Sequence, residues 1–208
     1  MVPDSRRRAM RLNDRQWAGM LLFVGTAQYL IIGLIIAEAT YPNPPGYSVS
    51  KNAISDLGVA PALPIFNPSV ILLGLIVLAI AWFLFRAFRD RLLSIVAALA
   101  GVGAIAVGIF TEDFGFIHSL VSLWTFVFIA LSAILTMRVV RPPFQFISVI
   151  LGVISLIALG LYISKTYLGL GPGGMERMIV YPIAVWGLAF GGYLFGMSPS
   201  SNGASVPS

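Results

Sequence analysis

The stretch TYPNPPGYSVSKNAISDLGVAPALPIFN, Thr40–Asn67, is the only long polar interruption between hydrophobic segments of the chain. Its prolines forbid a continuous helix, because proline lacks the backbone N–H that a helix interior needs. The sequence on both sides is apolar over lengths that suit a membrane, since a spanning helix needs about 20 mostly apolar residues. The stretch is therefore expected to be the long loop of a helical membrane protein.

The composition favours lipid as the solvent for most of the chain. Of the 208 residues, 58% are hydrophobic and 10% are charged, with a mean hydropathy of +0.93, whereas soluble domains carry about 25% charged residues. The chain contains no cysteine, which excludes disulfides and thiolate metal sites. The net charge of +5 comes from basic residues beside the hydrophobic segments. That pattern is typical of membrane orientation rather than of nucleic-acid binding.

Six segments are long and apolar enough to cross a bilayer. They predict an all-α polytopic membrane protein with one six-helix transmembrane domain at residues 17–197. A basic cytoplasmic segment at 1–16 precedes it, and a Ser-, Pro- and Gly-rich tail at 198–208 is expected to be disordered. The six segments are Trp17–Ala37, Pro68–Phe85, Leu92–Phe110, Ile117–Met137, Phe144–Ser164 and Met178–Phe195.

The lysines and arginines fall unequally on the two sides of this arrangement. Because cytoplasmic loops carry an excess of Lys and Arg, the richer side is predicted to be cytoplasmic, in a multi-pass protein of the cytoplasmic membrane. Both termini then lie in the cytoplasm, and the loop at 38–67 is extracytoplasmic. The richer side holds Arg6, Arg7, Arg8, Arg11, Arg15, Arg86, Arg89, Arg91, Arg138 and Arg141; the other holds Lys51, Lys165 and Arg177.

A cleavable signal peptide is the alternative interpretation of the N-terminus. The basic start, the apolar run and the tripeptide Ala37-Glu38-Ala39 imitate one. The apolar run of about 19 residues exceeds the 7–15 expected of a signal peptide, which favours a retained span.

Small residues form stripes on several expected helices. Such stripes let helix backbones approach closely in a membrane, where no hydrophobic effect drives association. The pair Gly187-x-x-x-Gly191 on the sixth segment predicts close packing within the chain, with an oligomer formed through these two glycines as the alternative. Gln28, near the middle of the first segment, is expected to bond a neighbouring helix.

The second half of the loop carries a polar element. Ser50–Leu57 is expected to form a short helix, in which Asn52 and Asp56 are four residues apart and share a face. Ser55 lies beside them. One side of the element therefore presents an amide, a hydroxyl and a carboxylate.

Polar side chains from other parts of the chain are expected at the same depth as this loop. His118 opens the fourth segment, with Ser122 and Thr125 at i+4 and i+7 on its face. Each member also has a purely structural interpretation, such as a solvated turn or a local ion pair. The members of this polar layer, besides the loop, are Glu38, Glu112, Asp113, His118, Glu176 and Arg177.

Several of these residues carry a resemblance to a known family. The elements that carry it are Tyr47-Ser48, Asn52-Ala53-Ile54-Ser55-Asp56-Leu57-Gly58, Asn67, Gly108-Ile109-Phe110 with Asp113 and His118, and Glu176-Arg177. With these elements, the chain from about Trp17 to Phe195 resembles the domain-of-unknown-function family 998, which consists of six-span prokaryotic, largely archaeal, membrane proteins. One departure is Thr111, which stands where a proline often follows the Gly-Ile-Phe triplet. The resemblance implies the fold and the membrane location, and it brings no established activity.

The polar layer supports two main functional hypotheses. The first is binding of a lipid or small amphiphile from the surrounding membrane, without a role for nucleic acid. Cations in the layer suit a headgroup phosphate. The ligand-binding residues would then be Asn52, Ser55, Asp56, Glu176 and Arg177.

The second hypothesis is an intramembrane lipid-modifying enzyme or hydrolase. Asp56, Asp113 and His118 are its catalytic candidates and its candidate metal ligands. The chain has one histidine, which makes a three-histidine zinc site impossible. The sequence leaves open whether the protein is an enzyme and which cofactor it would use. A packing subunit of a membrane complex or a transporter is a further alternative, although the span centres lack the ionisable groups of a proton relay.

Overall fold

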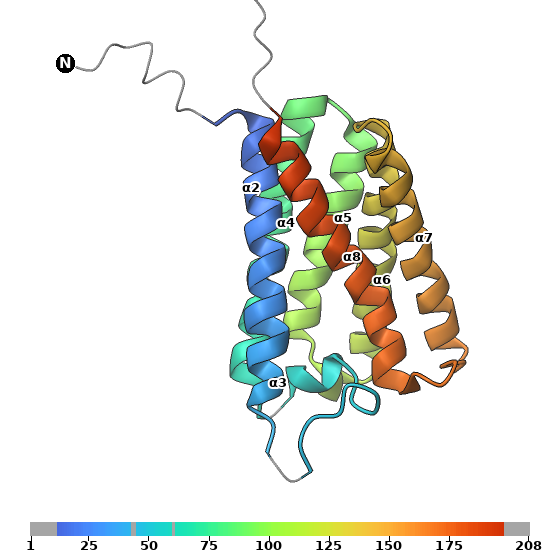
Figure 1. Ribbon diagram of the computed structural model, residues 1–208. Coiled ribbons are helices and arrows are strands. Elements are labelled where there is room, and N and C mark those ends of the chain that lie inside the picture. The colour runs from blue at the N-terminus through green and yellow to red at the C-terminus, as the bar shows by residue number, and fades with distance from the viewer. Residues whose placement is uncertain (1–11, 43–44, 60, 198–208) are drawn as a thin grey trace, which may run out of the picture.

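The computed structural model of the protein describes residues 12–42, 45–59 and 61–197 (Figure 1). Six helices are long and apolar enough to cross a membrane, and no strand occurs in the described residues. The predicted all-α, six-span membrane architecture is therefore confirmed. The expected tail at 198–208 and most of the basic segment at 1–16 lie outside the described residues.

The first span is composite. Helix α2 continues without interruption as the π-helix η1 and ends in the short helix α3. Each of the other spans is a single α-helix, and short 3₁₀ helices lie in the connections. The elements are α2 (Asp14–Gln28), η1 (Tyr29–Ile36), α3 (Ala37–Ala39), η2 (Ser55–Gly58), α4 (Leu63–Phe88), α5 (Arg91–Ile109), η3 (Glu112–Phe114), α6 (Phe116–Leu135), η4 (Thr136–Arg138), α7 (Phe144–Ile163) and α8 (Gly171–Gly196).

Several boundaries differ from those expected: α4, for example, begins at Leu63 rather than at Pro68, and two further differences bear on the first loop. Helix α8 begins at Gly171 rather than at Met178, so the charged pair at 176–177 lies inside its second turn. The helix of the first loop is η2 alone and does not extend back to Ser50. The reason is that Ser50 pairs with the start of α8. Its hydroxyl donates to the Leu170 carbonyl at 2.7 Å, and its own carbonyl accepts the Gly173 N–H at 3.0 Å.

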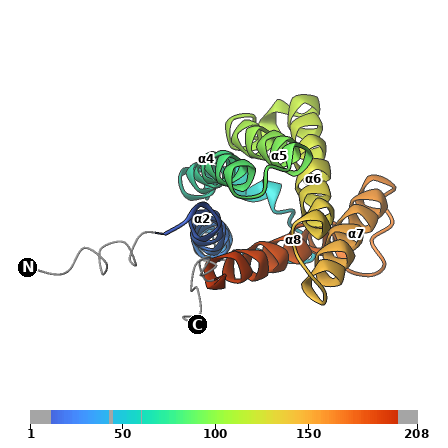
Figure 2. The same ribbon diagram turned by 90° about the horizontal axis from the view of Figure 1, so that it is seen from above.

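Five of the helices surround a common interior. Seen from above, α2, α4, α5, α6 and α8 form a ring, and α7 lies outside it against α6 and α8 (Figure 2). Close approaches between small residues hold neighbouring members of the ring together. A Cβ placed on Gly191 of α8 would lie 2.8 Å from the Gly19 carbonyl oxygen of α2, and one on Gly187 would lie 2.7 Å from the Thr26 hydroxyl.

These contacts give the stripes of small residues a partner within the chain. Gly187 and Gly191 are both buried against α2, so an oligomer formed through them would require α2 to move away. Gln28 also bonds a neighbouring helix, as expected. Its amide donates to the Ser69 carbonyl and accepts from the Ser69 hydroxyl, both at 3.0 Å.

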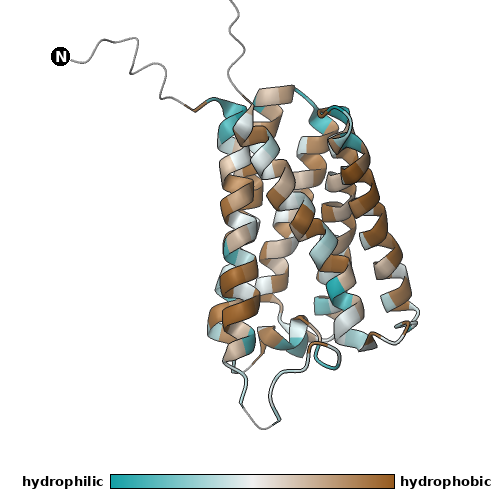
Figure 3. Cartoon of the chain, in the orientation of Figure 1, coloured by the Kyte–Doolittle hydropathy of each residue, from teal (hydrophilic) through white to brown (hydrophobic). Residues whose placement is uncertain are grey.

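The outer surface of the bundle is apolar along the length of the spans, with polar residues concentrated toward the two ends (Figure 3). Large hydrophobic side chains point outward on every span. Water would solvate such a surface poorly, whereas hydrocarbon solvates it well. Examples are Phe23, Trp82, Ile95, Leu120, Phe146 and Val185.

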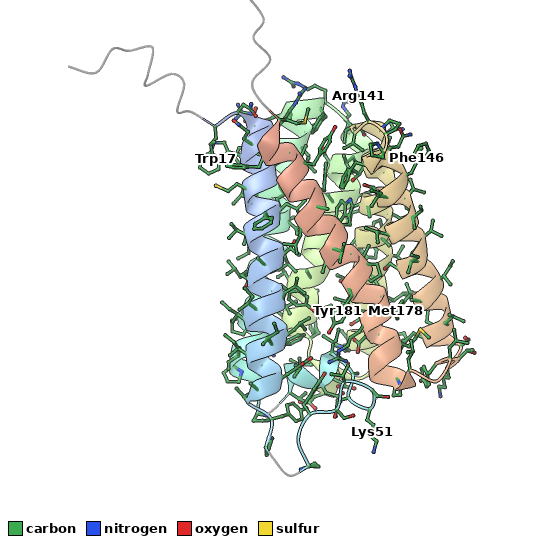
Figure 4. The ribbon with its side chains drawn as sticks, viewed as in Figure 1. Trp17, Lys51, Arg141, Phe146, Met178 and Tyr181 are labelled. Atoms are coloured by element: carbon green, nitrogen blue, oxygen red, sulfur yellow. The ribbon has the colours of Figure 1, made fainter. Side chains whose placement is uncertain are left out.

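The two ends of the bundle differ. One end, called the basic end, holds the described termini, the last turn of α4 with Arg86, and the connection between α6 and α7 that contains Arg138 and Arg141. The other end, called the loop end, holds the connection between α3 and α4. Arg141 and Lys51 lie at these opposite ends (Figure 4). Ion pairs join helices at the basic end, for example Arg138 with Asp90 at 2.6 Å.

Candidate functional site

Arg177 of α8 anchors the first loop to the bundle. Its side chain is 3% exposed although it carries a permanent charge. A charge buried in this way must be paired and hydrogen-bonded. The partners come from the loop, from α8 itself and from the end of the first span. Nη1 donates to the carbonyls of Val49 (3.1 Å), Asn52 (3.1 Å) and Gly173 (3.0 Å), and Nη2 donates to Glu38 Oε1 (2.7 Å) and the Tyr47 hydroxyl (2.7 Å).

The Tyr47 ring adds a further contact to Arg177. The guanidinium carbon lies 5.3 Å from the centre of that ring, within the range of a cation–π interaction. The two terminal nitrogens of the guanidinium are thus occupied by the protein's own carbonyls, carboxylate and phenol. These contacts support a role for Arg177 in fixing the loop, and they leave little of the group for a ligand phosphate.

Glu176, the neighbour of Arg177 on α8, is buried beside the loop. The carboxylate is 5% exposed and accepts a hydrogen bond from the backbone N–H of Ile54. Ile54 and Leu57, three residues further along the loop, are both buried, so the loop covers the loop end of the bundle. Glu176 and Arg177 therefore hold two different parts of the same loop.

The polar pair expected in the loop is present. The Asn52 amide donates to Asp56 Oδ2 at 2.9 Å, and Asn52 Oδ1 accepts the Ser48 N–H at 3.0 Å. Asp56 also has an acidic neighbour, Glu112 of η3. Partial loss of hydration, the Asp56 carboxylate and then Asp113 raise the pKa of Glu112 to about 7.

This raised pKa predicts a pH-dependent stability. Glu112 binds a proton more tightly in the folded chain than in the unfolded chain, so its contribution is fully present below the ordinary pKa of 4.5 and is lost as the pH rises through about 7. We expect wild type and Glu112→Gln to have similar thermal midpoints at the acidic end of this window. Above about pH 7, wild type should be the less stable of the two proteins. Parallel pH profiles for the two proteins would contradict the coupling between Glu112 and Asp56.

His118 makes two hydrogen bonds with defined roles. Nδ1 lies 2.7 Å from the Phe110 carbonyl oxygen, and Nε2 lies 3.2 Å from Ser122 Oγ. A carbonyl only accepts, so Nδ1 of the neutral ring carries the proton and Nε2 accepts. The Ser122 hydroxyl therefore donates to Nε2. Because Phe110 caps the end of α5, the ring faces the partly negative C-terminus of that helix.

The ring of five helices encloses a cavity of about 140 Å³ that η2 closes at the loop end. Its lining is mostly apolar and comes from α2, α4, α5, α6 and α8. Trp186, Leu22, Val77 and Ile129 line its deep part, toward the middle of the bundle. Its polar lining residues are Thr26, Tyr29, Ser55, His118, Ser122, Thr125 and Glu176.

The cavity collects only part of the predicted site. Ser55, His118 and Glu176 line it, and Ser122 and Thr125 accompany His118 on one face as expected. Asn52, Asp56 and Arg177 instead organise the loop above it. Asp113 lies in the exposed turn η3.

The three candidate metal ligands do not form a cluster. Among the described residues, no group of three His, Asp or Glu side chains is arranged to hold a metal ion. His118 turns inward to Phe110 and Ser122, whereas Asp113 is exposed. Asp56, Asp113 and His118 are therefore not brought together as a ligand set.

Tyr29 and Trp186 are among the cavity residues that sequence reasoning missed. Both occur in apolar helices, where an aromatic residue is normally part of a filled core. One signal was present for Tyr29. In the sequence, Tyr29 directly follows Gln28, which was expected to face a neighbouring helix. In the structure, the π-helix η1 begins at Tyr29. Insertions of this kind are frequent at functional sites.

Of the three comparisons with known proteins, one found a match. The family model described as "Protein of unknown function (DUF998)" matches residues 23–193. Neither the search of curated proteins nor that of solved structures found a match. The matched range contains the first loop and every residue that lines the cavity except Leu22. The chain therefore belongs to the domain-of-unknown-function family 998.

Proposed function

We propose that the protein binds a small amphiphile inside the helix bundle. The apolar part of the ligand occupies the deep part of the cavity, and its polar group lies beside Ser55, His118 and Glu176. The observation that carries this proposal is the cavity itself, whose lining is almost entirely apolar and whose few polar groups include Ser55, His118 and Glu176 toward the loop end. Such a lining suits a molecule that has one apolar and one hydrophilic end.

The size of the cavity limits the ligand. Its volume of about 140 Å³ is close to that of an engineered apolar cavity of about 150 Å³ that stays dry and binds benzene. As it stands, the cavity accepts an apolar group of roughly six carbon atoms. A longer chain would need lining side chains to change rotamer or would extend between helices into the bilayer.

The polar end limits the chemistry of the head group. Glu176 accepts hydrogen bonds, Ser122 Oγ keeps its lone pairs available because its own proton is donated to His118, and the Ser55 hydroxyl donates or accepts one. This set suits an alcohol or an amine better than a phosphate, because no free cation lines the cavity among the described residues. A small lipid-derived alcohol, amine or ester is the ligand class that the geometry supports best.

The proposal includes a location. The arginine-rich basic end would face the cytoplasm of the cell and the loop end would face outward, following the distribution of Lys and Arg. The polar end of the cavity then lies beneath the first loop, at the level of the outer leaflet of the cytoplasmic membrane. The membrane itself would be the source of the ligand.

Two alanine-to-leucine substitutions on α8 test the proposal. Ala184 is buried and lines the cavity, whereas Ala189 is exposed on the outer face of the same helix. Ala184→Leu would fill the cavity, and Ala189→Leu would add the same atoms to the lipid-facing surface. The probe is ω-bromohexanol, measured by equilibrium dialysis of the purified protein against matched empty micelles. We expect saturable binding to wild type and to Ala189→Leu.

Binding to Ala184→Leu should be at least about ten-fold weaker, which corresponds to a loss of about 1.4 kcal/mol. Both variants must retain the helical circular dichroism of wild type. Equal binding to the two variants would show that the alcohol partitions onto the outer surface, and it would overturn the proposal.

A further inference from the structure

The hydroxyl side chains of α6 and η4 follow one pattern with a single exception. In a helix, serine and threonine commonly donate to the carbonyl four residues earlier. Ser119, Thr125, Ser132 and Thr136 all do so, at distances of 2.7–3.2 Å. Ser122 instead donates to the imidazole of His118.

The exception forms an ordered chain of three groups. The Phe110 carbonyl fixes the tautomer of His118 from one side, and Ser122 donates to the free nitrogen on the other side. A hydroxyl, a base that accepts its proton and a third group that orients the base are the components of an activated nucleophile. Both side chains also line the cavity, so a ligand bound there meets them directly.

We propose that Ser122 and His118 are the nucleophile and the general base of an acyl-transfer reaction on an ester held in the cavity. The substrate class is a small ester of a carboxylic acid, with its apolar part toward Trp186. This inference rests on the proposed binding function for the placement of the substrate. It assigns to the same cavity a chemical step that binding alone does not require.

The reaction proceeds in two halves. Ser122 Oγ attacks the carbonyl carbon of the ester, and its proton passes to His118 Nε2. The tetrahedral intermediate collapses, the bond to the alcohol oxygen breaks, and Nε2 returns the proton to that oxygen. Water then attacks the acyl-serine and gives its proton to Nε2. Cleavage of the acyl–Oγ bond releases the carboxylic acid, and the proton on Nε2 restores the Ser122 hydroxyl.

The surroundings support each charge that develops. The imidazolium that forms on His118 faces the Phe110 carbonyl at the partly negative C-terminus of α5. The oxyanion requires donors, and the hydroxyls of Ser55 and Tyr29 belong to the same cavity lining. Glu176 in that lining contributes a further acceptor for the attacking water.

The test uses phenylmethylsulfonyl fluoride, because its phenyl group matches the size of the cavity. Ser122 Oγ would displace fluoride from the sulfur and remain as a sulfonate ester, which peptide mass spectrometry locates. We expect modification at Ser122 in wild type and in Ser119→Ala, which removes an exposed hydroxyl one turn away. Ser122→Ala should lose the adduct. His118→Gln should slow its formation by about 10²-fold or more, as expected for loss of a general base.

Hydrolysis of phenyl acetate by the same set of proteins gives a second readout, with the same order of rates expected. Saturable binding of ω-bromohexanol is measured in each preparation. If wild type binds the alcohol but shows neither the Ser122 adduct nor ester hydrolysis above Ser122→Ala, the catalytic proposal is overturned while the binding function stands. If wild type also fails to bind the alcohol, both proposals fail.

Discussion

Replacing Arg177 with alanine is expected to lower the free energy of unfolding by about 3 kcal/mol, because breaking a buried charged pair leaves its partners uncompensated. The guanidinium of Arg177 satisfies three backbone carbonyls, the Tyr47 hydroxyl and the Glu38 carboxylate at once. Its removal would leave carbonyls unpaired between the loop and α8. The Glu38 carboxylate retains some access to water and would rehydrate in part.

The measurement is reversible unfolding in mixed micelles, followed by circular dichroism. Lys51→Ala is the matched control, since it removes a cation of the same loop that projects away from the bundle (Figure 4). Its effect should stay within the range of about 0–1 kcal/mol of exposed charges. Tyr47→Phe should fall between the two, because it removes one hydrogen bond to Arg177. Equal losses for Arg177→Ala and Lys51→Ala would show that the buried guanidinium does not anchor the loop.

Gly173→Ala is expected to have an effect of similar size for a steric reason. A Cβ at Gly173 would collide with the Asn52 carbonyl oxygen and lie 2.6 Å from that of Val49. Both atoms belong to backbone, which cannot rotate out of the way as a side chain can. Overpacking of this kind costs about 1–3 kcal/mol and occasionally more. We expect the upper part of that range, with the loop displaced from α8.

Hydrogen exchange at the Ile54 amide reports on that displacement, since this N–H is bonded to Glu176. Exchange should accelerate in Gly173→Ala together with the loss of global stability. Gly192→Ala is the control on the same helix, where an added Cβ meets nothing within 4 Å. It should be neutral or stabilising by up to about 1 kcal/mol from helix propensity. Unchanged exchange at Ile54 in Gly173→Ala would mean that the loop does not pack against α8 as described.

The fold was largely predictable because it depends on local composition. A run of apolar residues long enough to cross a bilayer identifies a span regardless of its neighbours. The prediction was wrong for the start of α8, because Glu176 and Arg177 look like the polar boundary of a span. They lie inside the helix because the first loop, rather than water, satisfies them. That compensation depends on tertiary contacts across more than a hundred residues of sequence, and no local pattern encodes it.

The candidate site was predictable only between residues close in sequence. The i+4 and i+7 spacing placed Ser122 and Thr125 on the face of His118. Asn52 does contact Asp56, although the helix expected to pair them does not extend back to Asn52. Such spacing does not show which faces of different elements meet in the fold. Asp56 turned out to lie beside Glu112 rather than to join His118 in a metal-binding group.

The cavity itself has no signature in the sequence. Tyr29 and Trp186 occur at positions that equally suit a filled core, because hydrophobic periodicity indicates which side of a helix faces inward. It does not indicate whether the side chains that meet there fill the space. Filling depends on the summed volumes of residues from five helices.

The fluorescence of Trp186 tests the central claim most directly. Trp186 is 4% exposed and lines the cavity, whereas Trp82 is 60% exposed on the outer face of α4. Two single-tryptophan proteins, in which phenylalanine replaces the other tryptophans, are titrated with ω-bromohexanol, because bromine quenches indole on contact. We predict saturable quenching of Trp186, and quenching of Trp82 that only follows partitioning of the alcohol into the micelle. Absent or unsaturable quenching of Trp186 would contradict binding inside the bundle.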